Sequence, residues 1–274
     1  CRKPRHSSVS TSACPFCTGR LVDRFSAKSP DKVATEVAAL TDRHGVRTVM
    51  FTDAAINAEP ERFVATCRCL AREVPGLRWY AYAKVRGFTP AQAEAAAEAG
   101  CFALFFGAES ASPATLRFLG KDHTPHDIAA ALKAAADADI KSVAHLMYNT
   151  PHESLEDVAA LLALLGRHET DPKVEFMTQR FLLEPGSALS RFPARHGLGN
   201  LRLRDNGLFE REEYLYDLTD GTPHEAVRER HARHRELLAP ALERQERRVF
   251  GQRDSGQAGQ PRTAPGRRVV RELM

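Results

Sequence analysis

The sequence predicts an α/β protein built around a parallel sheet. Short apolar segments alternate with longer segments whose apolar residues recur at helical spacing. The short segments are hydrophobic on both faces, which is typical of parallel strands covered by helices. Polar residues follow the ends of these segments, and in parallel α/β proteins the carboxyl ends of the strands form the active face.

Six strands are expected in chain order. The first is a short polar segment ahead of two closely spaced cysteines, and the five later ones are runs of apolar and aromatic residues. The expected strands are 7–12, 46–51, 78–83, 101–106, 140–147 and 174–183.

Helices are expected between and after these strands. The first helix is predicted from its apolar residues, because Val33, Val37 and Leu40 recur at helical spacing. Ser29 is a suitable N-cap for this helix, and Gly45 is a suitable residue to end it. The expected helices are 30–44, 61–73, 89–100, 112–119, 124–138, 153–168 and 223–247.

Later elements carry boundary signals of their own. Thr89 and Pro90 open an alanine-rich helix that ends at Gly100. Ser154 and Asp157 have the spacing of a capping box at the start of the sixth helix. These signals place turns at both ends of the intervening strands.

Composition limits the kinds of protein that the chain can be. With 274 residues and 43% apolar content, it can bury one sizeable core plus an appendage. The net charge of +4 is mild and concentrated near the C-terminus, so nucleic acid is not an expected partner. No long apolar run is present, and the six cysteines are too scattered for a secreted disulfide scaffold. We therefore expect a cytoplasmic protein without a membrane partner.

Polar side chains gather where the expected strands end. They are Asp53, Lys84, Glu109, Asn149 and Glu184. Ordinary strand-to-helix capping explains Asp53 and the neighbouring Ser110 well. It explains Lys84 and Glu109 poorly, because each follows an apolar strand and is expected to point toward the active face at the carboxyl ends of the strands.

The stretch Cys14-Pro15-Phe16-Cys17 is the strongest single motif. Two thiolates at this spacing can hold a metal, and in a reducing compartment such a pair is metal-binding or redox-active rather than a structural disulfide. A structural zinc ion is one possibility, but zinc needs four ligands and the sequence offers no second pair at this spacing.

The chain resembles the radical S-adenosylmethionine (SAM) superfamily over about residues 14–198, and within it the branch that often carries an N-terminal cobalamin-binding domain. The two cysteines and Phe16 are similar to the second half of the CxxxCxΦC cluster motif. Four further segments resemble that branch's motifs in the same order. They are 49–53, 106–110 followed by 119–121, 147–157 and 184–187.

The resemblance implies a partial (β/α)6 TIM-like barrel with a [4Fe–4S] cluster at its mouth, and a mainly helical C-terminal extension follows from the sequence. Three cysteinates would hold the cluster, and SAM would bind its open iron. Because this branch often carries a cobalamin-binding domain, cobalamin is a further candidate cofactor. Partners would be a small-molecule or peptide substrate and an electron donor such as flavodoxin or ferredoxin. By resemblance and position, the residues expected to bind the cofactors are Phe16, Asp53, Lys84, Glu109, Ser110 and Asn149.

Two departures from the family pattern affect the expected site. The first cysteine of the motif should stand at position 10, where this chain has Ser10. Cys1, separated from Cys14 by twelve residues, is the alternative third ligand; otherwise the cluster site is degenerate or has lost a ligand by truncation. The second departure is the segment 148–151, which has Tyr-Asn-Thr-Pro where the family has glycine before proline.

The expected domains are a core barrel at 1–198, a lid and helical extension at 199–248, and a disordered basic tail at 249–274. Because the first residue is Cys rather than Met, we expect a fragment with an upstream domain missing. The helix at 223–247 alternates opposite charges at helical spacing, which predicts a solvated surface helix, and Pro240 is expected to kink or split it.

Four further residues are expected to have structural roles or an open orientation. Cys67 and Cys69 lie two positions apart in a helix, so we expect one buried and one partly exposed thiol. His145 is expected to be a core histidine with its hydrogen bonds satisfied. Arg180, in the last strand, is expected to face either the cavity or a helix.

Overall fold

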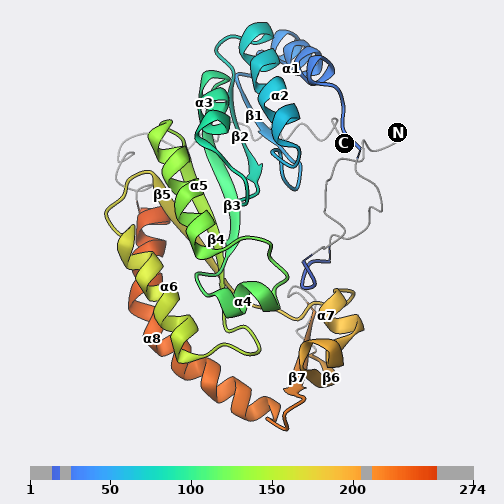
Figure 1. Cartoon of the computed structure of the whole chain (residues 1–274), viewed down its shortest axis with the longest axis vertical. Coiled ribbons are helices and arrows are strands. Elements are labelled where there is room, and N and C mark those ends of the chain that lie inside the picture. The colour runs from blue at the N-terminus through green and yellow to red at the C-terminus, as the bar shows by residue number, and fades with distance from the viewer. Residues whose placement is uncertain (1–13, 19–25, 205–211, 252–274) are drawn as a thin grey trace, which may run out of the picture.

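A computed structural model describes residues 14–18, 26–204 and 212–251 (Figure 1). Its centre is a five-stranded parallel sheet in which the strands follow one another in chain order, β1-β2-β3-β4-β5. The strands are β1 (Thr48–Phe51), β2 (Arg78–Ala83), β3 (Cys101–Glu109), β4 (Lys141–Tyr148) and β5 (Val174–Arg180). The predicted α/β class and parallel sheet are confirmed. The strand expected at 7–12 lies outside the described residues.

Six helices alternate with these strands or follow them. They are α1 (Pro30–His44), α2 (Pro60–Glu73), α3 (Pro90–Glu98), α4 (Pro113–Phe118), α5 (Pro125–Asp137) and α6 (Leu155–Arg167). Side-chain caps begin most of them. Ser29, Thr89 and Ser112 accept hydrogen bonds from first-turn amides, and α5 and α6 each start with a full capping box.

One face of the sheet is covered by helices and forms the main core. Alternate residues of the strands point to this face, among them Trp79, Leu104 and Ala144, all fully buried. The other face carries Tyr80, Tyr82, Phe102, Phe105 and His145, whose rings lie against one another across β2, β3 and β4.

The aromatic face is not fully covered by the part of the chain that the structure describes. Met50, Tyr82 and Met177 are 40%, 37% and 41% exposed, although each is a large apolar or aromatic side chain. We call this surface the inner face, because the opposite face carries the helices.

The chain after β5 builds a second, smaller core. It contains α7 (Ala188–Arg191), a 3-10 helix (Pro193–His196), β6 (Leu198–Arg204), β7 (Glu213–Leu218) and α8 (His224–Gly251). β6 and β7 form an antiparallel pair, so the extension that was expected to be mainly helical also contains strands. Leu183, Leu189 and Leu198 are buried in this core.

The C-terminal helix is not split at Pro240, and only part of its surface is solvated, because one stripe of it is buried. α8 runs without a break through Pro240 and packs along α6 and β5 (Figure 1). Leu238 and Ala241 are buried against the main core. The sequence pattern concealed this packing because the buried stripe of α8 also contains the polar residues His234 and Gln245.

The expectation for the two thiols of α2 was wrong, because Cys67 and Cys69 are both buried. Both thiols belong to the main core, and Cys69 Sγ also donates to Asp31 Oδ1 of α1 at 3.4 Å.

Among the described residues, no helix combines the length and apolar character needed to cross a bilayer.

Candidate functional site

The two-cysteine segment forms a tight turn. The backbone amide of Cys17 donates to the Cys14 carbonyl at 3.1 Å, Cys14 is half-buried, and Cys17 is exposed. Both thiols therefore come from one short loop, as two ligands of the same metal centre require. Thiolates are the soft ligands that iron–sulfur clusters use.

Contacts with three distant segments hold this turn in place. The Leu189 amide, at the start of α7, donates to the Pro15 carbonyl at 3.0 Å, and Thr18 Oγ1 donates to Glu184 Oε2 at 3.2 Å. Gly120, directly after α4, has φ +64°, and a Cβ built there would lie 2.5 Å from Pro15 Cδ. Position 120 therefore favours glycine for two reasons: its backbone has a positive φ, and Pro15 of the cysteine turn lies where a side chain would begin.

Lys121 connects the cysteine turn to the end of β3. Its Nζ donates to Glu109 Oε1 at 2.9 Å, lies 5.5 Å from the centre of the Phe16 ring, and is within hydrogen-bonding reach of Cys14. Burial acts to lower the pKa of the ammonium group, but the Glu109 carboxylate and Cys14 outweigh it and raise the pKa above its usual value. A positive charge therefore lies beside Cys14 and Phe16 of the cysteine turn.

Glu109 ends β3 in an unusual backbone conformation. Its φ is +62°, a region that costs a non-glycine residue roughly 1–2 kcal/mol, and the pairing of β3 with β4 is irregular between Phe106 and Glu109. A Cβ built at Gly107 would meet Glu109 Oε1 at 3.0 Å and Lys121 Nζ at 3.4 Å. The absence of a side chain at Gly107 leaves space for this buried ion pair.

The loop after β4, residues 149–153, is the second strained strand end. Asn149 has φ +59° and is buried, its amide donates to Glu153 Oε2 at 2.7 Å, and its Oδ1 has no hydrogen-bond partner among the described residues. Burial raises the pKa of Glu153, and hydrogen bonds from His234 and from the loop amides oppose this rise.

Helix α8 holds this loop from outside the sheet. His234 Nδ1 lies 2.9 Å from Glu153 Oε1, and His231 Nε2 lies 3.0 Å from the Thr150 carbonyl, to which it donates. Arg230 donates to the carbonyl of Pro151. We call these three residues of α8 the loop clamp.

The other predicted residues occupy the same edge of the sheet in different settings. Lys84 follows β2, and its backbone amide and carbonyl both bond to the Asn57 side chain, at 2.7 and 3.0 Å. Asp53 is half-buried after β1. Ser110 Oγ accepts from the Ser112 amide at 3.0 Å, which is the local turn role that capping predicts. The cofactor roles predicted for these residues stay predictions.

His145 departs from the sequence expectation of a satisfied core histidine. It lies on the inner face against Tyr82 and Phe105, and its Nε2 is buried without a hydrogen-bond partner in the described part of the chain. Burial lowers its pKa, so the ring is neutral near pH 7. A buried ring nitrogen without a partner is an exception to the rule that buried polar atoms are hydrogen-bonded, and it marks His145 as a residue of interest on the inner face.

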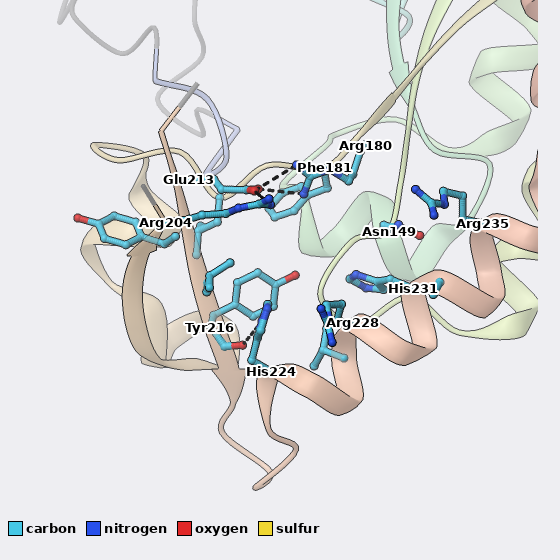
Figure 2. A pocket seen from close by; sticks show the side chains of 15 residues that line it. Asn149, Arg180, Phe181, Arg204, Glu213, Tyr216, His224, Arg228, His231 and Arg235 are labelled. Carbon is cyan, nitrogen blue, oxygen red and sulfur yellow. Dashed lines mark hydrogen bonds and ion pairs between the residues drawn. The ribbon is translucent and has the colours of Figure 1, made fainter. Parts of the chain in front are cut away.

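A cavity of about 300 Å³ lies between the ends of β4 and β5, the β6–β7 pair and the first half of α8 (Figure 2). Arg180 lines it and pairs with Glu213, at 2.9 and 3.2 Å. The same carboxylate binds Arg204 at 2.9 Å. Arg180 therefore faces the cavity and the hairpin, which decides between the two orientations that the sequence left open.

The chain is an α/β protein with a turn of two thiols docked at the carboxyl edge of its parallel sheet. The family model for the radical SAM superfamily matches residues 6–165, more than half of the chain, and the chain belongs to this superfamily. Membership confirms the recognition made from the sequence motifs and the two expected cofactors, a [4Fe–4S] cluster and SAM.

Individual relatives agree with this assignment. The chain is 28% identical over 160 residues to the uncharacterized methyltransferase PH0819 of Pyrococcus horikoshii, and the match covers 58% of the chain and 35% of that protein. It therefore spans about a third of the length of this curated relative.

Solved structures show the same fold. The radical SAM methyltransferase TsrM of Kitasatospora setae, described with cobalamin and a [4Fe–4S] cluster bound, aligns with a TM-score of 0.60 and 18% identity over 72% of this chain and 40% of that chain. The cobalamin-dependent SAM radical enzyme OxsB aligns with a TM-score of 0.58 and 15% identity, over 78% of this chain and 38% of that chain. These likenesses confirm the partial-barrel fold.

The described residues supply only part of a cluster site. No group of three His, Cys, Asp or Glu side chains within them is placed to hold a metal. Cys14 and Cys17 fit two ligands of a cubane, and both candidates for the third, Cys1 and Ser10, lie outside the described residues.

Sequence reasoning did not assign chemistry to Lys121 or to the loop clamp. The lysine stands within a motif that carried the resemblance, so its position was a usable signal. The clamp residues of α8 gave none, because only the fold brings them to a loop some eighty residues earlier in the chain.

Proposed function

We propose that this chain is the core of an enzyme that cleaves SAM reductively and uses the resulting 5′-deoxyadenosyl radical to modify a substrate. The observation that carries the proposal is the cysteine turn fixed beside a buried Lys121–Glu109 pair at the end of a parallel strand. Cys14 and Cys17 would hold a [4Fe–4S] cluster with Cys1 as the third ligand.

A cluster held by Cys14 and Cys17 would supply the single electron that reductive cleavage of SAM to methionine and a 5′-deoxyadenosyl radical requires. The chain's own residues bind and orient the reactants. Lys121 places a positive charge next to Cys14 and holds Glu109 through the ion pair. Glu109 Oε2 remains available for a polar group of SAM because Oε1 takes the Lys121 hydrogen bond.

The inner face is the proposed substrate surface. Its aromatic side chains form a continuous apolar surface on one side of the sheet, and His145 Nε2 is buried there without a partner among the described residues. A bound substrate would have to cover this surface, since a carbon radical reacts with groups other than the substrate when it is left open to them. Residues 209–216, predicted from the sequence as a lid, lie partly outside the described residues, and their covering role stays a proposal.

The reaction that we favour is methylation with cobalamin as a further cofactor. The support is the name of the Pyrococcus relative, a methyltransferase, and the cobalamin-dependent enzymes among the structural neighbours. Rearrangement of the substrate without cobalamin is the second candidate. No residue of this chain is assigned to cobalamin, and the electron donor, a flavodoxin or ferredoxin, is proposed from the chemistry alone.

The proposal is tested by anaerobic reconstitution with iron and sulfide. The wild-type protein is expected to turn brown and to hold about four irons per chain, as a cubane cluster requires. After chemical reduction it should release 5′-deoxyadenosine and methionine from SAM.

Variants identify the ligands. Cys14→Ala and Cys17→Ala should each lose most of the bound iron, and Cys69→Ala serves as the control because its thiol is buried in α2. Cys1→Ala should lose iron while Ser10→Ala keeps it, if Cys1 is the third ligand. A colourless protein that binds zinc at the cysteine turn would refute the proposal in favour of a structural metal.

A further inference from the structure

The cavity shown in Figure 2 is lined by arginines from three separate elements. We call it the arginine pocket. Arg180 comes from β5, Arg204 from β6, and Arg228 and Arg235 from α8. We propose that the arginine pocket binds an organic anion, a small molecule that carries a phosphate or carboxylate group on an apolar or aromatic body.

The charges that line the pocket are strongly unequal. Glu213 is its only acidic lining residue among those described, and both of its oxygens already serve Arg180 and Arg204. Arg228 and Arg235 have no carboxylate partner in the described part of the chain, and both side chains lie along the side of the cavity that α8 forms (Figure 2). An excess of guanidinium groups favours a ligand with anionic oxygens, because guanidinium matches carboxylate and phosphate geometry.

His231 does not add to this positive charge at neutral pH. It donates from Nε2 to the Thr150 carbonyl, and burial, together with the charge of Arg230, lowers its pKa to about 4. It is therefore neutral, and the arginines supply positive charge to the pocket.

The other lining residues indicate which groups the ligand carries besides its anionic oxygens. Phe181, Leu183, Tyr216 and Val227 provide apolar and aromatic surface. Asn149, which is 6% exposed, lines the same cavity with an Oδ1 that has no partner among the described residues. A buried acceptor without a partner is costly, so the expected ligand also carries an N–H or O–H donor.

The arginine pocket is distinct from the cysteine turn. None of Cys14, Cys17, Glu109 or Lys121 lines it, and it lies on the side of β5 that faces α8. Its volume of about 300 Å³ matches the lower end of the range for small-molecule sites. Asn149 is the connection between the pocket and the loop held by the clamp.

Calorimetric titration of the full chain at low ionic strength tests the proposal. The probes are phenyl phosphate, phenylacetate and inorganic phosphate. At least one of the two aromatic anions is expected to bind with a dissociation constant on the order of 0.1–1 mM and more tightly than inorganic phosphate. A preference for phenyl phosphate would identify a phosphate ligand, and a preference for phenylacetate would identify a carboxylate ligand.

Variants on one helix provide the matched comparison. Arg228→Gln and Arg235→Gln should each weaken binding by roughly 3–10-fold, since each removes one charge-assisted contact at an exposed position. Arg233→Gln is the control, because Arg233 is an exposed arginine of α8 that does not line the pocket. Circular dichroism confirms that all three variants are folded.

Two results would overturn the proposal: no binding of either aromatic anion to the wild-type protein, or equal weakening in the control and in the pocket variants. The outcome is separable from that of the proposed function. If the wild-type protein holds its cluster and cleaves SAM but binds no anion, only the pocket inference fails. If it binds the anion with the expected arginine dependence but holds no cluster, only the proposed function fails.

Discussion

At the scale of single residues, the site is marked by strained backbone at the ends of two neighbouring strands. Glu109, the last residue of β3, and Asn149, which follows β4, both have positive φ, and both are buried. Asparagine tolerates this conformation well, whereas glutamate does not. Strain of this kind persists only where surrounding contacts enforce it, and at Glu109 the contact is the ion pair with Lys121.

Removing the charge of Glu109 should weaken SAM binding. Glu109→Gln is expected to reduce affinity by roughly 1.5–3 kcal/mol, the range for a hydrogen bond to a charged group, while part of the iron content survives. Equilibrium binding of SAM to the reconstituted protein measures the effect. Glu94→Gln, on the exposed side of α3, should leave the affinity unchanged. Equal affinities in the Glu109 variant and the wild-type protein would show that this carboxylate does not contact SAM.

At the scale of elements, the cysteine turn is positioned by what it docks against rather than by its own sequence. Its partners are the glycine that follows α4, the Leu189 amide in α7 and the glutamate that follows β5. A short loop with one internal hydrogen bond has little stability alone, so these docking contacts determine where the thiols lie.

Gly120→Ala should therefore affect metal binding more than stability. The glycines Gly120 and Gly45 both have φ +64°, but only at Gly120 would a Cβ collide with the turn; nothing lies within 4 Å of a Cβ at Gly45. Each alanine variant should lower the free energy of unfolding by about 1 kcal/mol, because alanine is strained in this conformation. Iron content after reconstitution should fall only in Gly120→Ala. Equal iron contents in the two variants would mean that Pro15 adjusts without displacing the cysteines.

At the scale of the whole molecule, α8 joins the small C-terminal core to the main sheet. Its apolar residues enter the main core, and its loop clamp holds residues 149–153. Within the clamp, His231 is kept neutral near pH 7, because burial and the nearby Arg230 lower its pKa to about 4.

This suppressed protonation predicts a loss of stability in acid. Between about pH 6.5 and pH 4 the unfolded chain binds a proton at His231 that the folded chain does not, so stability falls as pH falls through this window. The full contribution is on the order of 2–3 kcal/mol near pH 4. Burial lowers the pKa of His123 and His145 as well, which acts in the same direction, while the raised pKa of Glu153 opposes it.

Urea denaturation of the cluster-free protein at several pH values between 7 and 4.5 measures this effect. His231→Gln keeps a donor for the Thr150 carbonyl and should show a shallower decline than the wild-type protein. His126→Gln, at an exposed position, should follow the wild-type curve. If the stability of His231→Gln declines with falling pH as steeply as that of the wild-type protein, groups other than His231 cause the loss of stability in acid.

Much of the fold could be predicted from the sequence because it depends on local patterns. Apolar periodicity and caps such as Ser29 and Ser154 fix the alternating strands and helices, and parallel strands necessarily bring residues such as Lys84 and Glu109 to one edge. The role of α8 could not be predicted, since its contacts with the loop join residues far apart in the chain through buried polar groups. A charge pattern read along one helix does not reveal such contacts.

The loop clamp also sets an order of events during folding. The contacts of Arg230, His231 and His234 span 79 to 81 residues of chain, whereas each strand of the sheet pairs with the next one along the chain. At a synthesis rate of about 5–20 residues per second, the loop leaves the ribosome roughly 4–16 s before its clamp. The parallel sheet can form during that interval, because its contacts join residues that are closer together in the sequence. We therefore expect the loop 149–153 to be fixed after the rest of the strand edge has folded.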